Sequence, residues 1–292
     1  MPLAHVLLAL IVTVIWGLSF VVIKLGVGTT PPLLLASLRF LFAAVPAVFL
    51  VPRPPVGWRS LAAYGFFLGV AQFGLLFAAI ALGMPASLAS VVMQAQVFFT
   101  ILFAALLMGE RPGRHQILGG IVACLGLVLM ALPRLSGGGA GPFLMTVAAA
   151  ASWGVANIVS KKAGRVDMLG YVVWASLIPP LPLLAFSLML DGPGQVLAAL
   201  SHVNGGMIGA VAYLAYPTTV FAFAVWSFLL SRYPAATVTP FALLVPVAGI
   251  LGSTLILGET MRVPEAIGGA IIVLGLAINV FGLRVMRRLR AA

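Results

Sequence analysis

Apolar runs long enough to cross a membrane recur along the whole chain, separated by short connections rich in Gly, Pro and charge. A helix needs about 20 mainly apolar residues to cross the hydrocarbon core of a bilayer, which is roughly 30 Å thick. Of the 292 residues, 63% are hydrophobic and 7% are charged. A soluble domain carries about 25% charged residues. The sequence therefore predicts an all-α integral membrane protein.

We predict ten membrane-spanning helices. The predicted spans are 4–25, 31–51, 59–82, 85–107, 114–132, 141–161, 168–190, 205–231, 234–257 and 264–284. The connection between the seventh and eighth spans is the longest, and it has room for a short helix at the membrane interface. The single Cys124 lies in an apolar run, where we expect a buried and unreactive thiol.

The distribution of basic residues predicts how these spans are oriented. An even number of spans places both termini on one side, and loops rich in Lys and Arg stay in the cytoplasm. Twelve of the sixteen Lys and Arg residues fall on the side of the termini. These are Arg53, Arg59, Arg111, Arg114, Lys161, Lys162, Arg165, Arg232, Arg284, Arg287, Arg288 and Arg290. We therefore expect both termini in the cytoplasm and the protein in the plasma membrane, which is the inner membrane of a bacterium.

The two halves of the chain share a pattern of residues, which indicates an internal repeat. At an offset of 149, PASLAS at 85–90 corresponds to PAATVT at 234–239, and GER at 109–111 corresponds to GET at 258–260. Over 42 positions in this register, 11 are identical. The offset is 137 nearer the start of each half, so the second half contains 12 extra residues, which we place between the seventh and eighth spans.

The start of each half shows the same correspondence. WGLSFVVIK at 16–24 resembles WGVANIVSK at 153–161, and each segment ends where an apolar run meets charge. We divide the chain into a five-helix repeat at 1–134, a Gly-rich connector at 135–141 and a second repeat with a basic tail at 142–292. Because five is odd, the second copy enters the membrane in the opposite orientation. Two inverted repeats are typical of secondary transporters that alternate between two states.

These residues resemble those of the EamA-type family of the drug/metabolite transporter superfamily. The shared features are the Trp-Gly…Lys end of the first span, the pair Arg39-Phe40 in the second span, and in each half a Gly-Glu pair followed by eight residues and then Gly. The resemblance covers the whole chain. It implies ten spans in two inverted five-helix repeats and a transport function, and within the family the chain is most similar to bacterial exporters of aromatic and other neutral amino acids.

Polar and aromatic side chains in the middle of spans are the candidates for a substrate cavity. An amide or indole N–H in hydrocarbon needs a partner, so these residues should face protein or water. The candidates are Trp16, Gln72, Phe73, Phe77, Gln94, Phe98, Trp153, Asn157, Tyr213 and Tyr216. Hydrogen bonding and packing between helices is the alternative interpretation for each of them. A cavity of this kind, without a fixed negative charge, suits a neutral or zwitterionic solute.

A second set of residues is expected to have structural or gating roles. Its members end or interrupt spans, and they are Lys24, Lys161, Glu110, Glu259, Pro240 and Pro246. The Lys side chains can extend to the lipid headgroups and the Glu side chains can cap a neighbouring helix, or both can form ion pairs that close a gate. Arg39 belongs to this set and lies two turns inside its span. A charge at this depth costs about 2.5–3.5 kcal/mol, so it either anchors the helix or faces a cavity.

The function classes are narrowed by what the sequence lacks. It contains no nucleotide-binding loop, CxxC or HExxH motif, and all five acidic residues fall near predicted span ends. We therefore predict a secondary exporter of amino acids that works by alternating access, without a strongly coupled carboxylate inside the membrane and without a cofactor or metal. The alternative is an exporter of other small metabolites or drug-like compounds, and a membrane enzyme is disfavoured. The expected partners are small neutral or zwitterionic solutes and the lipid bilayer, with neither nucleic acid nor an obligate protein partner.

Overall fold

The computed structural model describes residues 1–135, 139–164, 166–233 and 235–291, of which the side chains at 134–135, 235–236 and 283–291 are left undescribed. Residues 136–138 of the expected connector at 135–141 lie outside the described residues, as do Arg165 and Pro234. The side chains of the basic tail, Arg284, Arg287, Arg288 and Arg290, lie outside them as well.

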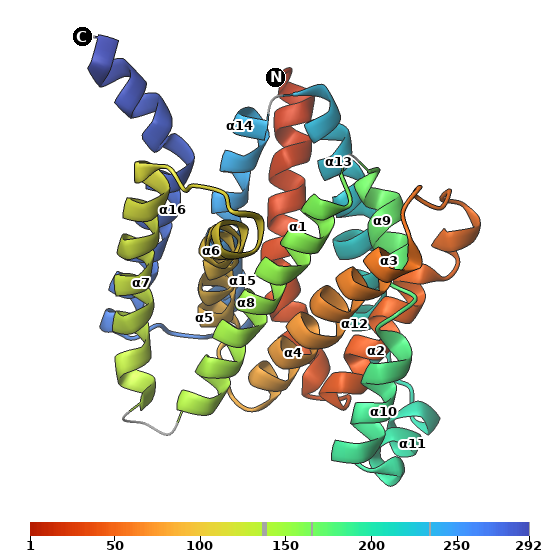
Figure 1. Ribbon diagram of the computed structural model, residues 1–292. Helices are drawn as coiled ribbons and strands as arrows, with labels where there is room; N and C mark the ends of the chain where they lie inside the picture. Colours follow the sequence, from red (N-terminus) through yellow and green to blue (C-terminus); the bar gives the residue numbers. More distant parts are fainter. Residues whose placement is uncertain (136–138, 165, 234, 292) are drawn as a thin grey trace.

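The described residues form helices joined by turns and loops (Figure 1). The first half contains α1 (Leu3–Val27), α2 (Pro32–Ala44), η1 (Ala47–Phe49), α3 (Trp58–Tyr64), η2 (Gly65–Phe73), α4 (Gly74–Ala81), α5 (Ala86–Val92), η3 (Met93–Ala95), α6 (Gln96–Met108) and α7 (Arg114–Leu135). The second half contains α8 (Ala140–Lys162), α9 (Met168–Ala175), α10 (Pro180–Leu190), α11 (Pro193–Ser201), α12 (Gly205–Ala215), η4 (Tyr216–Phe221), α13 (Ala222–Arg232), α14 (Ala235–Val238), η5 (Thr239–Leu244), α15 (Val245–Leu257) and α16 (Val263–Ala291).

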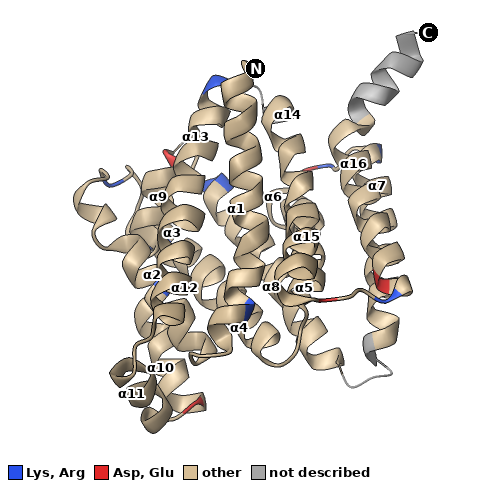
Figure 2. Cartoon of the chain, turned by 180° about the vertical axis from the view of Figure 1, so that it is seen from behind, with Lys and Arg blue, Asp and Glu red and all other residues tan. Residues whose placement is uncertain are grey.

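Ten helical stretches of the described chain are long and apolar enough to cross a membrane, which confirms the predicted fold class. Charged residues are sparse along them (Figure 2). Large apolar side chains such as Leu255, which is 82% exposed, cover the outer surface of the helices. Cys124 is also exposed, so the expectation of a buried thiol was wrong: its apolar run faces outward on α7. The protein is a multi-pass membrane protein.

The last helix of each half packs against its counterpart through glycines. A Cβ atom on Gly119 of α7 would lie 2.6 Å from the carbonyl oxygen of Gly275 of α16, and a Cβ atom on Gly275 would lie 2.6 Å from the oxygen of Gly119. Gly126 and Gly268 are in the same reciprocal contact, 2.6 Å and 2.7 Å in the two directions. Only glycine lets the two backbones approach this closely. When the two halves are aligned with an offset of 149 residues, Gly119 corresponds to Gly268 and Gly126 to Gly275. The contact between α7 and α16 is therefore symmetric between the two halves.

Corresponding spans are also interrupted at corresponding positions. The third span of each half contains a π-helix, η2 or η4, and an offset of 149 maps 67–72 onto 216–221. The fourth span of each half contains a 3₁₀ turn, η3 or η5, and the same offset maps 93–95 onto 242–244. Pro217 and Pro240 lie in the two interruptions of the second half. Proline has no backbone N–H group to donate to the helical hydrogen bonds, which favours an interruption at these positions. Such interruptions often occur at functional sites and hinges.

The Gly-Glu pairs end the fourth spans in the same way. Gly109 and Gly258 have φ of 67° and 65°, in the left-handed region that glycine tolerates best. The backbone N–H of Glu110 donates to Ala104 and that of Glu259 to Ser253, at 3.3 Å and 3.2 Å. These bonds satisfy the last carbonyl groups of each helix and turn the chain toward the following span.

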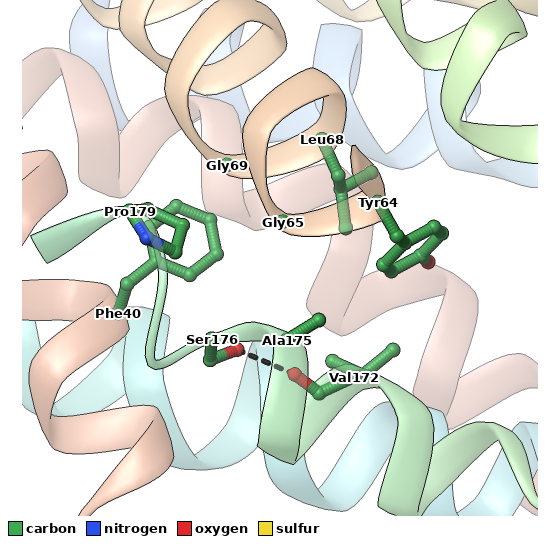
Figure 3. A pocket seen from close by; sticks show the side chains of 9 residues that line it. All are labelled: Phe40, Tyr64, Gly65, Leu68, Gly69, Val172, Ala175, Ser176 and Pro179. Carbon is green, nitrogen blue, oxygen red and sulfur yellow. Dashed lines mark hydrogen bonds between the residues drawn. The ribbon is translucent and has the colours of Figure 1, made fainter. Parts of the chain in front are cut away.

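Other proline and glycine residues make close contacts inside the molecule. The seventh span breaks between α9 and α10, at Pro179 and Pro180. Gly69 of η2 lies against Pro179, and a Cβ atom on Gly65 would lie 2.5 Å from the oxygen of Ala175. This GxxxG pair therefore packs within the chain. Figure 3 shows the narrow crevice left between these segments, which has no room for a water molecule. The long connection between the seventh and eighth spans holds the short helix α11, as expected.

Candidate functional site

The N–H group of Trp16 finds its partner on the π-helix η4. Trp16 Nε1 donates to the carbonyl oxygen of Thr218 at 3.1 Å. This carbonyl group is available because η4 departs from regular α-helical hydrogen bonding. The indole ring lies 5.6 Å from the ring of Phe223 and 5.2 Å from that of Trp226, measured between centroids. Tyr213 adds a further bond from the eighth span to α1, since its hydroxyl donates to the carbonyl of Ile15 at 3.0 Å. Trp16 is half-buried and forms one wall of an aromatic cluster.

Arg39 is also buried against η4. Its Nη2 donates to Thr219 Oγ1 at 3.2 Å, and its guanidinium lies 3.7 Å from the centroid of Phe73 and 5.1 Å from that of Phe40. Only 2% of the residue is exposed. Thr219 follows Thr218 in the sequence, so Trp16 and Arg39 bind consecutive residues of one π-helix.

Amide side chains connect helices of the two halves. Gln94 of η3 donates from Nε2 to the carbonyl oxygen of Ala242 in η5 at 3.2 Å, which links the two 3₁₀ turns. Asn157 of α8 donates from Nδ2 to Gln96 Oε1 at 2.8 Å and to Thr100 Oγ1 at 3.0 Å, both on α6. These contacts fit the interpretation of hydrogen bonding between helices.

The structure does not bring all of the candidate cavity residues together. Phe77 is fully buried in the core, and Gln72 is buried with its Oε1 unpartnered. Phe98 and Trp153 are half-buried and pack against the core. Tyr216 is 42% exposed and lines a surface groove of about 650 Å³, to which Arg39 does not contribute.

The two glutamates that follow the left-handed glycines have different partners. Glu259 accepts hydrogen bonds from the backbone N–H groups of Ala86 and Ser87, each at 2.9 Å, and from Ser87 Oγ at 2.7 Å. It thereby caps the N-terminus of α5, where Pro85 has no side chain that could do so. Glu110 instead forms an ion pair with Lys161 at 2.7 Å, with the side chains 44% and 49% exposed.

Lys24 has a different role from its counterpart Lys161. Its Nζ donates to the carbonyl oxygen of Ile80 at 3.3 Å, near the C-terminus of α4, where a cation is favoured by the helix dipole. Pro246 lies in the first turn of α15 and is buried, and Pro240 lies in η5.

Corresponding segments of the two halves differ in burial. Every residue of α5 and η3 is buried. In the second half no residue of η5 is buried, although Val238, the counterpart of Ala89, is. The first part of the fourth span, α5 and η3, is thus packed in, whereas η5 at the corresponding positions of the ninth span contains no buried residue.

Sequence reasoning missed several of the residues that complete these contacts. Thr218 and Thr219 directly follow Pro217, and a proline in a predicted span could have drawn attention to them as polar residues at a helix interruption. Ser87 lies in the first turn after Pro85, at a helix N-terminus. A hydroxyl at this place could have been predicted to donate a hydrogen bond to an acidic side chain. Thr100 is one turn from Gln96, and this spacing could have indicated a shared face.

A family model of transporters matches both halves of the chain. The match covers residues 3–132 and 141–281 and is described as the EamA-like transporter family. The chain belongs to the EamA-like transporter family. The two matched ranges agree with the repeat in helix interruptions, glycine caps and glycine contacts described above.

Two bacterial members of the EamA-like family are similar over nearly their whole length. A protein of Salmonella typhimurium named a probable amino-acid metabolite efflux pump is 43% identical over 291 residues, which cover 98% of this chain and 97% of that protein. Its namesake in Escherichia coli is 43% identical over 283 residues, 95% of each chain. A crystal structure with 22% identity and a TM-score of 0.60 covers 96% of this chain and 98% of its own, and it shows a shared fold.

Proposed function

We propose that this EamA-like transporter exports amino acids and their metabolites, aromatic and other neutral ones among them, by alternating access across the plasma membrane. The names of the two bacterial relatives support the substrate class and the direction. The observation that carries the mechanism is the difference in burial between α5–η3 and η5. Two copies with the same helix interruptions stand in opposite environments, as expected when each copy can adopt the conformation of the other.

The orientation predicted from the basic residues indicates which end of the protein would face the outside and which the cytoplasm. The N-terminus of α5 and Glu259 would lie on the outer side, and Glu110 with Lys161 on the cytoplasmic side. The outer side is then closed by the three hydrogen bonds to Glu259, and the cytoplasmic side is open along η5. In the opposite state, Glu110 would leave Lys161 and cap the N-terminus of α14, as Glu259 caps α5.

The side chains around η4 are the proposed contacts of the substrate. The cluster of Trp16, Phe223 and Trp226 offers a flat apolar surface to a side chain of the solute. The five acidic residues lie at helix ends, away from the middle of the spans. A proton-coupled step through a buried carboxylate is therefore not part of the proposal.

Flux in proteoliposomes tests this function. Vesicles containing the purified protein are loaded with radiolabelled phenylalanine, serine or alanine, and efflux is compared with that from protein-free vesicles. We expect faster efflux of at least one amino acid, and no accumulation when only a pH gradient is imposed. Equal rates in the two preparations would overturn the proposed substrate class. Drug-like compounds and sugars enter as competitors, and inhibition by these alone would favour the alternative exporter.

A further inference from the structure

A buried cation without a compensating charge lies in the middle of this membrane protein. Arg39 has five N–H donors, and Thr219 Oγ1 accepts one of them. Its Nε and Nη1 have no hydrogen-bond partner. Among the described residues no carboxylate forms an ion pair with it, and its other close neighbours are the rings of Phe40 and Phe73. A charge buried in this way is costly unless a partner compensates it during function.

Two further buried polar atoms without partners belong to the sequence neighbours of residues that contact this guanidinium. Gln72 precedes Phe73 in η2, and its Oε1 is an acceptor without a donor. Thr218 precedes Thr219 in η4, and its Oγ1 is likewise unpartnered. Buried polar groups are nearly always hydrogen-bonded, so orphans on adjoining segments indicate a ligand that the described state does not hold.

The chemistry of these orphans is specific. A guanidinium with free N–H groups binds a carboxylate in a bidentate manner, and a threonine hydroxyl can donate a further bond to it. The amide oxygen of Gln72 accepts from an N–H group without requiring that this group be charged. The chain's five acidic residues are at helix ends. The protein therefore has no carboxylate in the middle of the membrane that could form an ion pair with the ammonium group of a solute.

We propose that Arg39, with Thr218 and Gln72, is the site that binds the carboxylate of the transported solute. The inference rests on the proposed function and narrows it: the substrates are carboxylic acids with an apolar or small side chain, and the α-ammonium group is not required. N-acylated amino acids are therefore substrates as good as the amino acids themselves. Decarboxylated amines and carboxamides are not.

The position of the site relative to η4 connects it to the aromatic cluster. Trp16 binds Thr218 and Arg39 binds Thr219, so a solute with its carboxylate at Arg39 can direct its side chain toward Trp16. Arg39 is covered in the described state by Phe73 of η2 and Thr219 of η4. Both belong to π-helices, where the helical ladder is already interrupted, and a shift of either segment uncovers the guanidinium.

Competition against efflux or counterflow of labelled amino acid tests the proposal in the unmodified protein. The competitors are phenylalanine, N-acetylphenylalanine, phenylalaninamide and phenethylamine, with serine, N-acetylserine, serinamide and ethanolamine as a second series. We expect the two acids of a series to compete within about threefold of each other, and the amide and amine to be weaker by at least about tenfold, since bonds to charged groups are the strong ones. An amide or amine that competes as well as the acid would overturn the assignment.

Variants locate the effect at Arg39. Arg39→Gln should abolish the preference for the acid over the amide and the amine. Arg39→Lys keeps the charge but loses the bidentate guanidinium geometry, so it should retain part of this preference. Arg53→Gln is the matched control, because Arg53 is exposed and also lies over a ring, that of Trp58 at 4.4 Å. A full acid preference in Arg39→Gln would overturn the assignment. If Arg39→Gln does not fold, the competition series in the unmodified protein decides alone.

The failure of this site is distinguishable from the failure of the proposed function. If no labelled amino acid crosses the membrane faster than in protein-free vesicles, both proposals fall. If the amino acids are transported and the amides or amines compete equally, the export function stands and the carboxylate site at Arg39 falls.

Discussion

At the scale of single residues, the described contacts join polar side chains to backbone groups that helix interruptions leave available. Trp16 donates to the carbonyl of Thr218 in η4, and Gln94 donates to that of Ala242 in η5. A regular α-helix would use such carbonyls in its own ladder. The π-helix and the 3₁₀ turn therefore supply the acceptors that let a buried indole and a buried amide lie in the membrane.

Replacing Trp16 by Phe should show what this bond contributes. The variant keeps an aromatic ring but loses the N–H donor, so we expect a loss of about 0.5–1.5 kcal/mol in the free energy of unfolding and a lower rate of efflux. Thermal unfolding in detergent and flux in proteoliposomes measure the two effects. Trp58→Phe is the control, because Trp58 is 51% exposed near the end of its span. Equal changes in the two variants would contradict the role given to the bond.

The sequence identified the polar and aromatic residues in the middle of spans as a group. It did not predict on which face of its helix each of them lies. Tyr213 and Tyr216 are three positions apart, and an α-helix would place them near one face. Tyr216 begins a π-helix, in which the turn is wider, and it lies on the surface while the hydroxyl of Tyr213 bonds to α1. The pattern of apolar residues does not contain the information that the helix changes type at this point.

At the scale of elements, the ten spans follow from hydropathy, and the repeat follows from Gly, Pro and Glu positions. The break at Pro179 and Pro180 and the interruptions at Pro217 and Pro240 could be predicted because proline cannot donate to the ladder. The π-helix η2 has no proline and was not predicted. Its partner η4 at the offset of 149 was the signal that could have found it.

The contact between α7 and α16 gives a test of the packing at this scale. A Cβ atom on Gly119 would lie 2.6 Å from the oxygen of Gly275, whereas a Cβ atom on the neighbouring Gly120 would lie 3.6 Å from Phe98, an ordinary contact. We expect Gly119→Ala to destabilise the protein by about 1–3 kcal/mol through overpacking. Gly120→Ala on the same helix should be close to neutral. Thermal unfolding of the two variants measures the difference, and equal stabilities would contradict the close approach.

The two glutamates give a second test. Glu259 accepts three hydrogen bonds at the N-terminus of α5, and such bonds to a charged group contribute about 1.5–3 kcal/mol each before the costs of ordering. Glu110 forms an exposed ion pair, which contributes about 0–1 kcal/mol. Glu259→Gln should therefore lower the free energy of unfolding more than Glu110→Gln does. A larger loss in Glu110→Gln would show that the contact at α5 does not hold the described state.

At the scale of the whole molecule, we interpret the protein as two copies of one five-helix unit in unequal conformations. The symmetric contact of α7 with α16 remains common to both copies, while α5 and η3 of one copy are buried and η5 of the other contains no buried residue. The sequence contains the repeat but not the asymmetry, because corresponding residues such as Ser90 and Thr239 are chemically similar and differ only in their surroundings.

Cysteine labelling at this pair tests the exchange of access most directly. In a Cys124→Ser background, Ser90→Cys and Thr239→Cys place equivalent thiols in the buried and the open copy. A membrane-impermeant thiol reagent is applied from each side, with and without saturating substrate on the opposite side. We predict that Thr239→Cys reacts from the cytoplasmic side and Ser90→Cys only from the outer side, and that substrate raises one reactivity as it lowers the other. Labelling of both positions from the same side of the membrane would contradict the inverted repeat and the alternating access built on it.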